Sequence, residues 1–144
     1  MHPIPAGFLF PSNSPGTLVL PLFSGRIAAG FPSPADDHLE KCLDLNEYLI
    51  QHPAATFFAW AQGHSMINAG IRHGDLLIID RSLEPKDQSI VIAVVNGELT
   101  VKRLRLKVTG VWLMPENPEF SPIKITDDMD LHIWGVVKHA IHSF

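Results

Sequence analysis

The sequence predicts a mainly β protein, with a small, strongly bent, mostly antiparallel fold and one short helix. Short runs rich in β-branched and aromatic residues alternate with turn residues through most of the chain. Between two of these runs lies Asn96-Gly97, a dipeptide typical of a two-residue hairpin turn. The chain of 144 residues can bury a core without a metal or a disulfide. The expected strands span 56–62, 75–80, 89–95, 98–106, 111–115 and 131–137.

The amino-terminal part of the chain differs in composition from the rest. Seven of the twelve prolines lie within residues 1–35, and proline removes a backbone donor and blocks helices and central strands. We therefore expect residues 1–35 to form a flexible arm and residues 36–144 to form the β domain. Residues 36–50 are expected to form the main helix, which two leading aspartates can cap. An apolar stretch within the arm, residues 18–31, is expected to dock onto another surface.

Composition and charge exclude several classes of protein. The net charge of −4 argues against a mainly electrostatic grip on DNA or on an anionic membrane. The single cysteine, Cys42, excludes an internal disulfide or a cysteine-rich zinc site, and it suits a reducing compartment. No apolar run reaches the roughly 18 residues of a membrane span, and the start of the chain lacks the positive charge of a signal peptide. We expect a cytoplasmic protein with no membrane contact, no metal and no cofactor.

Two residues stand out as candidates for chemistry. Ser65 lies in Gly63-His64-Ser65-Met66, directly after an expected strand, where a serine can project its Oγ into a groove beside backbone amides. Lys102 shares one strand face with Leu104 and Leu106, so we expect it to point inward, where burial lowers the pKa of its amine. The alternative interpretations are a serine that caps a turn and a lysine that extends its ammonium to water.

Together, a turn serine and an inward lysine match the Ser-Lys variant of nucleophilic catalysis. That chemistry needs the two side chains within hydrogen-bond reach, about 3 Å. A histidine-based triad fits less well, because His64 directly neighbours Ser65 and adjacent side chains tend to point apart. No metal-ligand set and no HExxH, phosphate-loop or dinucleotide motif is evident. We therefore interpret most of the eight histidines as surface or packing residues.

Four motifs carry a resemblance to a known family: Gly63-His64-Ser65-Met66, Gly70-Ile71, Gly74-Asp75-Leu76 and Thr100-Val101-Lys102-Arg103-Leu104. Together they resemble the LexA/UmuD family of self-cleaving Ser-Lys peptidases, the peptidase S24 type. Further stretches at 30–35, 44–46, 49–53 and 74–78 are most similar to the UmuD branch. The similarity extends from about Leu20 to near the carboxyl end, and the motifs are specific as a set rather than singly.

The resemblance implies roles for particular residues and a fold of the LexA/UmuD carboxyl-terminal type. Ser65 matches the family's nucleophile and Lys102 its general base, and the scissile bond falls at Ala29-Gly30. For the oxyanion we expect the backbone amides of Ser65 and Met66.

The resemblance also implies a place in the SOS response to DNA damage. Proteins of the UmuD branch cut themselves when a RecA filament on single-stranded DNA stimulates them. The shortened form, as a homodimer, then joins a UmuC-type polymerase in error-prone translesion synthesis. This branch lacks a DNA-binding domain of the LexA kind, so we expect no sequence-specific DNA binding.

Some features depart from the UmuD pattern, and other functions stay open. His64 stands where an acidic residue is usual, Ala29 stands where some relatives have cysteine, and the first 17 or so residues match nothing recognised. Cleavage within one chain or between two chains is equally open. A signal-peptidase-like protease also pairs Ser-Met with a lysine, although no membrane segment supports it. A dimeric polymerase-accessory module with an idle dyad is the non-enzymatic alternative.

Overall fold

The computed structural model describes residues 16–23, 25–32, 34 and 41–144. These residues fall into two compact units, which divide between Gln51 and His52. None of the helices in the described ranges is long and apolar enough to cross a membrane.

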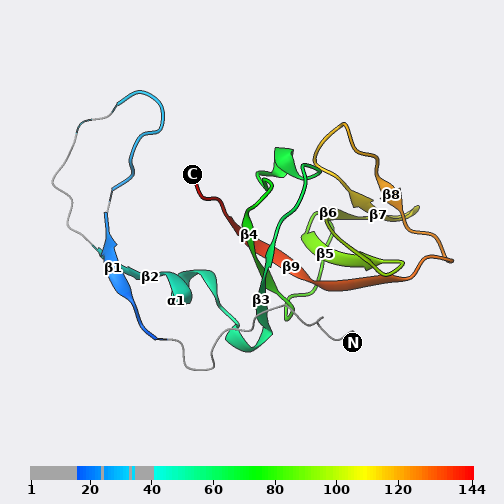
Figure 1. Cartoon of the computed structure of the whole chain (residues 1–144), viewed down its shortest axis with the longest axis horizontal. Helices are drawn as coiled ribbons and strands as arrows, with labels where there is room; N and C mark the ends of the chain where they lie inside the picture. The colour runs from blue at the N-terminus through cyan, green and yellow to red at the C-terminus, as the bar shows by residue number, and fades with distance from the viewer. Residues whose placement is uncertain (1–15, 24, 33, 35–40) are drawn as a thin grey trace. The chain divides into compact units, whose positions relative to one another are not determined.

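The unit before His52 contains a two-stranded sheet and a short helix. Strand β1 (Val19–Leu22) pairs antiparallel with β2 (Lys41–Asp44), and α1 (Leu45–Leu49) follows β2 directly (Figure 1). The Asp44 carboxylate accepts a hydrogen bond from the Asn46 N–H at 3.0 Å and caps the helix. Pro21 fits in β1 because a two-stranded sheet leaves each strand with a free edge.

The prediction of a helix over residues 36–50 is wrong in its bounds. Residues 41–44 form a strand, and α1 has five residues. The cause is the pairing of β2 with β1, since it supplies backbone partners that local sequence does not reveal. Residues 36–40, the first part of the expected helix, lie outside the described residues.

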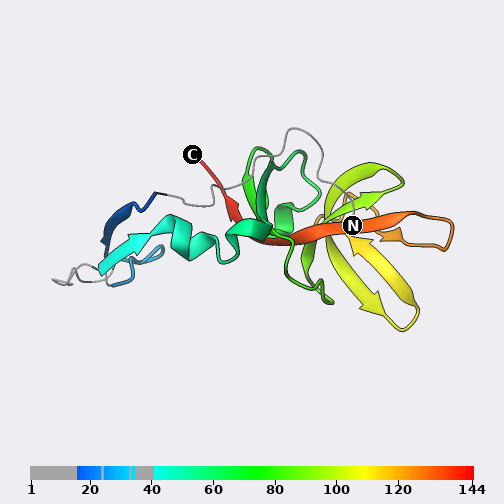
Figure 2. The same cartoon turned by 90° about the horizontal axis from the view of Figure 1, so that it is seen from below.

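The second unit is built on a seven-stranded antiparallel sheet with the order β3-β4-β9-β5-β6-β7-β8. The long strand β9 runs through the middle of the sheet, between β4 and β5 (Figure 2). Its pairing shifts register at Ile78/Ile79 and at Ile92/Ala93, and such bulges bend a sheet. The strands span Thr56–Trp60 (β3), Leu76–Asp80 (β4), Ile90–Val95 (β5), Glu98–Lys107 (β6), Gly110–Met114 (β7), Ile123–Lys124 (β8) and Leu131–Ile141 (β9).

The predicted fold class is confirmed, because the described chain is mostly antiparallel strand with one short α-helix. All six expected strands are present within a few residues of their expected bounds. Strands β1, β2 and the two-residue strand β8 were not predicted. The last strand was expected to end at residue 137, whereas β9 continues to Ile141.

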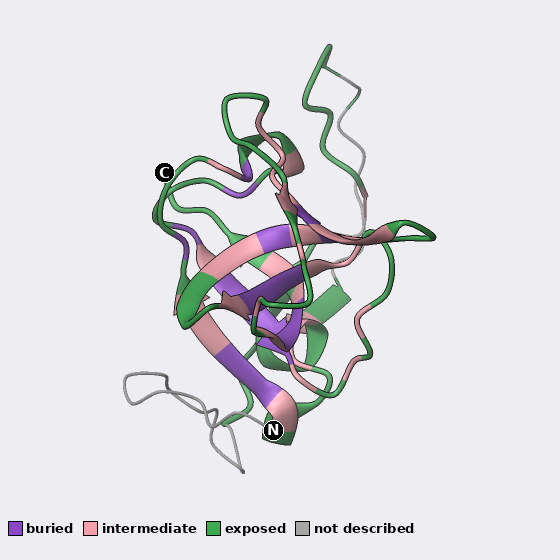
Figure 3. Ribbon diagram, turned by 90° about the vertical axis from the view of Figure 1, so that its right-hand side faces the viewer, coloured by how far each residue is buried: buried purple, intermediate pink, exposed green. Residues whose placement is uncertain are grey.

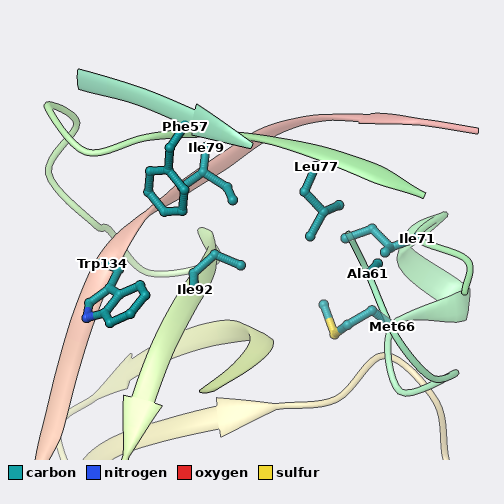
Figure 4. Close-up of a cluster of buried hydrophobic side chains, with 8 residues drawn as sticks. All are labelled: Phe57, Ala61, Met66, Ile71, Leu77, Ile79, Ile92 and Trp134. Carbon is teal, nitrogen blue, oxygen red and sulfur yellow. The ribbon is translucent and has the colours of Figure 1, made fainter. Parts of the chain in front are cut away.

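The sheet buries residues on both of its faces, because successive side chains of a strand alternate. Ile92 of β5 belongs to one cluster, while its neighbours Val91 and Ala93 belong to the other. In β5, β6 and β9, burial is concentrated in the middle stretch of the strand (Figure 3). Figure 4 shows the first cluster, which consists of Phe57, Ala61, Met66, Ile71, Leu77, Ile79, Ile92 and Trp134. The second cluster consists of Val91, Ala93, Leu104, Leu113 and Val136.

Gly135 of β9 lies where β4 approaches closely. A Cβ at this position would lie 2.6 Å from Ile79 Cγ2 and 3.1 Å from the Asp80 carbonyl oxygen. We expect Gly135→Ala to lower the free energy of unfolding by about 1–3 kcal/mol, because packed neighbours must move. Urea unfolding measures the change. Gly16→Ala is the matched control, since a Cβ there meets no atom within 4 Å in the part of the chain that the structure describes. Equal losses in both variants would contradict the steric explanation.

Candidate active site

Ser65 lies on a turn that is anchored to the core of the second unit. After β3 the chain forms the Ser65 turn, residues 63–66, which begins with Gly63 at a φ of 89°. Met66, the residue after Ser65, is fully buried in the first cluster. Two backbone hydrogen bonds of 2.8 Å join Ala61 to Gly74 and Asp75, and they close the base of the loop. The nucleophile candidate is therefore held next to a packed side chain.

Lys102 points inward from β6, as the alternation of the strand predicts. Its side chain is 9% exposed, and Leu104 on the same face is buried. The interpretation of Lys102 as a lysine that extends to water is therefore wrong. Leu106, expected on the same inner face, is exposed, because it lies near the end of β6 beyond the second cluster.

The structure brings Ser65 and Lys102 together. Lys102 Nζ lies 3.0 Å from Ser65 Oγ, 2.8 Å from Thr100 Oγ1 and 3.2 Å from the Val101 carbonyl oxygen. A charged amine donates to all three oxygens, whereas a neutral amine can accept the proton of the serine hydroxyl. The distance matches the hydrogen-bond reach that a Ser-Lys pair requires.

Burial lowers the pKa of the Lys102 amine below its ordinary value. Removal from water destabilises the ammonium more than the neutral amine. The three oxygens that contact the amine are uncharged, so they compensate the charge less than a carboxylate would. At a given pH, the site therefore holds more of the neutral amine than a lysine in water would.

Ser65 and Lys102 both line a groove of about 650 Å³. Its walls come from the end of β3, the Ser65 turn and the first half of β6. Trp60 and Phe120 also line the groove, and both rings are exposed to solvent. An extended peptide segment could contact apolar side chains here while it reaches the serine hydroxyl.

The expected cleavage site, Ala29-Gly30, lies in the first unit. Both residues are exposed, and a Cβ built on Gly30 would meet no atom of the described residues within 4 Å. The flanking side chains of Ile27 and Phe31 are 83% and 94% exposed. The described residues of the first unit thus leave Ala29 and Gly30 exposed.

Two buried aspartates of the second unit form contacts that were not predicted from the sequence. Asp75, at the base of the Ser65 loop, accepts hydrogen bonds from the Arg72 N–H and from His142 Nδ1 at 2.8 and 2.7 Å. Burial alone would raise the pKa of Asp75, but these bonds lower it below its ordinary value. Asp80 likewise contacts His52 and Ser82. Their signal in the sequence was weak, because the pairings with His142 and His52 join distant segments.

The interpretation of the histidines as surface or packing residues understates their contacts. Besides the contacts to Asp75 and Asp80, His132 pairs with Asp130, and His73 accepts a hydrogen bond from the Gly63 N–H. His64 is exposed beside Ser65. Among the described residues, no group of three or more His, Cys, Asp or Glu side chains could hold a metal ion.

Comparisons with known proteins agree on the class, which is that of the serine peptidases. The family described as Peptidase S24-like matches residues 21–138, and the chain belongs to this family. The resemblance inferred from the four motifs is thereby confirmed.

Three relatives indicate how much of the chain is shared. Protein ImpA of Escherichia coli is 49% identical over 125 residues, which cover 86% of this chain and 84% of the relative. Protein SamA of Salmonella typhimurium is 46% identical over 133 residues, which cover 92% of each chain. The LexA repressor of Pseudomonas chlororaphis is 40% identical over 113 residues, which cover 78% of this chain and 55% of the repressor.

The variant Lys102→Met tests the burial of the amine without reference to catalysis. Because the folded-state pKa is lower than the ordinary 10.5, the unfolded chain binds more protons between the two pKa values, and stability rises with pH there. We expect the free energy of unfolding of the wild type to increase, relative to the variant, between about pH 7 and about pH 10. Urea unfolding at both pH values measures this difference.

Lys86→Met is the matched control, because Lys86 is exposed. The increase with pH should be larger relative to Lys102→Met than relative to this control, because only Lys102 is buried. Equal pH dependence for both variants would contradict the burial of the Lys102 amine.

Proposed function

We propose that the chain is a UmuD-like protein of the SOS response that cuts its own backbone at Ala29-Gly30 with a Ser-Lys dyad. The observation that carries the proposal is the 3.0 Å separation of Ser65 Oγ and Lys102 Nζ, with the amine buried. Membership of the Peptidase S24-like family supports the same chemistry. The proposed reaction needs no metal and no cofactor.

In the first half of the reaction, neutral Lys102 takes the Ser65 hydroxyl proton while Oγ attacks the Ala29 carbonyl carbon. The carbonyl oxygen becomes an oxyanion, which the backbone amides of Ser65 and Met66 stabilise. Lys102 then gives its proton to the Gly30 nitrogen, and the C–N bond breaks. This leaves Ala29 as an acyl ester on Ser65 and frees the new amino terminus at Gly30. Water, activated by the neutral amine, finally hydrolyses the ester.

The substrate is a segment of the same protein. The groove therefore needs less affinity for it than a protease needs for a separate chain. The small residues Ala28, Ala29 and Gly30 leave the carbonyl accessible, and the exposed apolar residues on either side suit an apolar groove. Attachment to the enzyme makes the attack effectively unimolecular. Attack on the partner's arm in a homodimer uses the same chemistry.

The proposed biological role rests on the similarity to ImpA and SamA, which covers most of the chain. We propose that a RecA filament on single-stranded DNA stimulates the cut in the cytoplasm. The shortened homodimer then serves as an accessory subunit of a UmuC-type translesion polymerase. The chain spans about half of the LexA repressor. We therefore extend to this chain the peptidase chemistry of that relative, but we do not extend sequence-specific DNA binding.

Incubation of the purified chain at alkaline pH tests the proposal. The fraction of neutral Lys102 rises about tenfold per pH unit until pH reaches the lowered pKa, so the cleavage rate should rise equally and then level off. Mass spectrometry should find a fragment that begins at Gly30. A fragment cut elsewhere, or a rate that is independent of pH, would contradict the mechanism.

Ser65→Ala and Lys102→Ala serve as controls in the same incubation. Each should lower the rate by at least about 10²-fold, since each removes a group that forms or breaks a bond in the proposed reaction. Far-ultraviolet circular dichroism should show the same fold for both variants. Cleavage at the native rate by either variant would assign its role to another residue.

Ala29→Trp tests the position of the cut. The indole should prevent approach of the carbonyl to Ser65 and lower the rate by about 10²-fold or more. Because Ala29 is exposed, the melting temperature should not change. Thr17→Trp is a substitution at another exposed position of the same unit. This variant should cleave itself at the wild-type rate. Equal rates for both variants would place the scissile bond elsewhere.

A further inference from the structure

Partners from outside the Ser65 turn hold its backbone at three consecutive residues. The Gly63 N–H donates to His73 Nδ1 at 3.0 Å. The next two carbonyl oxygens accept hydrogen bonds, that of His64 from Asn117 Nδ2 at 2.9 Å and that of Ser65 from the Glu116 N–H at 2.8 Å. The turn is thus fixed on both sides of the nucleophile.

We propose that His73 and Asn117 are positioning residues for self-cleavage, an inference that rests on the proposed function. Neither side chain contacts the reacting atoms in this account. Each fixes a backbone group of the Ser65 turn, and together they hold Ser65 Oγ within reach of Lys102 Nζ. A displacement of about 1 Å at a reacting group can lower a rate about 10²-fold.

The contact of His73 defines its tautomer. Nδ1 accepts the Gly63 N–H, so this nitrogen carries no proton and the neutral ring is protonated at Nε2. Gly63 adopts a positive φ of 89° that a side chain would oppose. Because glycine also permits many other conformations, an external acceptor at its N–H restricts the point where the chain enters the turn.

Asn117 is itself held in place, because both ends of its side-chain amide form hydrogen bonds. Nδ2 donates to the His64 carbonyl, and Oδ1 accepts the Glu119 N–H at 3.0 Å. The second bond fixes the side chain within its own turn and determines which end of the amide faces His64. The donor is therefore oriented before it meets the Ser65 turn.

The segment that contains Asn117 also connects the turn to the strand of the lysine. Both backbone groups of Glu116 contact the region of the turn. Its N–H donates to the Ser65 carbonyl oxygen, and its carbonyl oxygen accepts a hydrogen bond from the Asn68 N–H. Its carboxylate accepts a hydrogen bond from Arg103 Nε at 2.6 Å. Arg103 directly follows Lys102 on β6. A continuous set of bonds thus links the serine, the segment 116–117 and the strand of the base.

Substitutions at Asn117 test one side of the turn. Asn117→Asp keeps the Oδ1 acceptor for the Glu119 N–H but replaces the donor that faces the His64 carbonyl. Asn117→Ala removes the same donor without adding a charge. We expect both variants to cut at least about tenfold more slowly than the wild type. Slow cleavage in Asn117→Asp alone would identify the added charge as the cause and overturn the proposal for this residue.

Asn96→Asp is the matched control for Asn117→Asp. Asn96 Oδ1 accepts the Asp130 N–H at 2.9 Å, so the substitution again keeps an acceptor and exchanges the amide nitrogen for oxygen. Asn96 lies in the turn between β5 and β6 and does not line the groove. This variant should cut within about twofold of the wild-type rate, since it leaves the Ser65 turn intact.

Rescue by a conservative substitution tests the other side. His73→Ala removes the acceptor for Gly63 and should slow cleavage several-fold, whereas His73→Asn offers Oδ1 near the place of Nδ1 and should recover most of the rate. The Gly63 amide proton resonance should shift in the alanine variant and return in the asparagine variant. His132→Ala is the control for loss of a histidine elsewhere. Equal rates in both His73 variants would overturn the role of His73.

Labelling of Ser65 with a fluorophosphonate separates this inference from the proposed function. The reagent reports how readily Ser65 Oγ displaces fluoride, whatever bond the protein cuts. A wild type that is labelled but uncut would refute the proposed cleavage, and slower labelling of the Asn117 and His73→Ala variants would still support positioning. Labelling of these variants at the wild-type rate would overturn the inference, as would a wild type that is neither labelled nor cut.

Discussion

Removal of the Lys102 amine from water is the constraint on which the site depends. Hydrogen bonding on both sides fixes β6, since it pairs with β5 and β7. This arrangement directs Lys102 into the domain beside Val91 and Leu104 rather than toward solvent. Desolvation costs the ammonium more than the amine, and the neighbouring oxygens carry no charge that would offset this cost. The fold itself thereby lowers the pKa of the amine that we propose as the base.

The serine is supplied by a different kind of structure. Lys102 belongs to the sheet, whereas Ser65 belongs to a turn whose conformation depends on contacts from other parts of the domain. Burial of Met66 fixes one side of that turn, and the backbone and side chains of segment 116–117 fix another. Asp75 and His142 hold the base of the loop. The paired strand that carries Lys102 and the turn that carries Ser65 together set the distance of 3.0 Å between Lys102 Nζ and Ser65 Oγ.

Local patterns in the sequence predict those features that depend on neighbouring residues. Asn96-Gly97 and its β-branched flanks predict the hairpin of β5 and β6, and strand alternation predicts the inward direction of Lys102. Its place in a turn after a strand makes Ser65 a candidate, and the resemblance matches it to the family's nucleophile. Features that need partners far along the chain are not predicted: the strand at 41–44 forms through pairing with β1, and Asn117 reaches His64 across 53 positions. Leu106 shows the limit of alternation, because the strand extends beyond the core that would cover it.

Titration of the Lys102 side chain itself tests the central claim most directly. Carbon-13 NMR of the lysine ε-carbons can follow it in the full-length Ser65→Ala variant, and Lys102→Arg in the same background identifies the resonance. The account predicts a pKa below the ordinary 10.5, because burial disfavours the ammonium. A Lys102 resonance that titrates at or above this value would contradict the account, since the proposed base would then carry its proton under the conditions in which it must act.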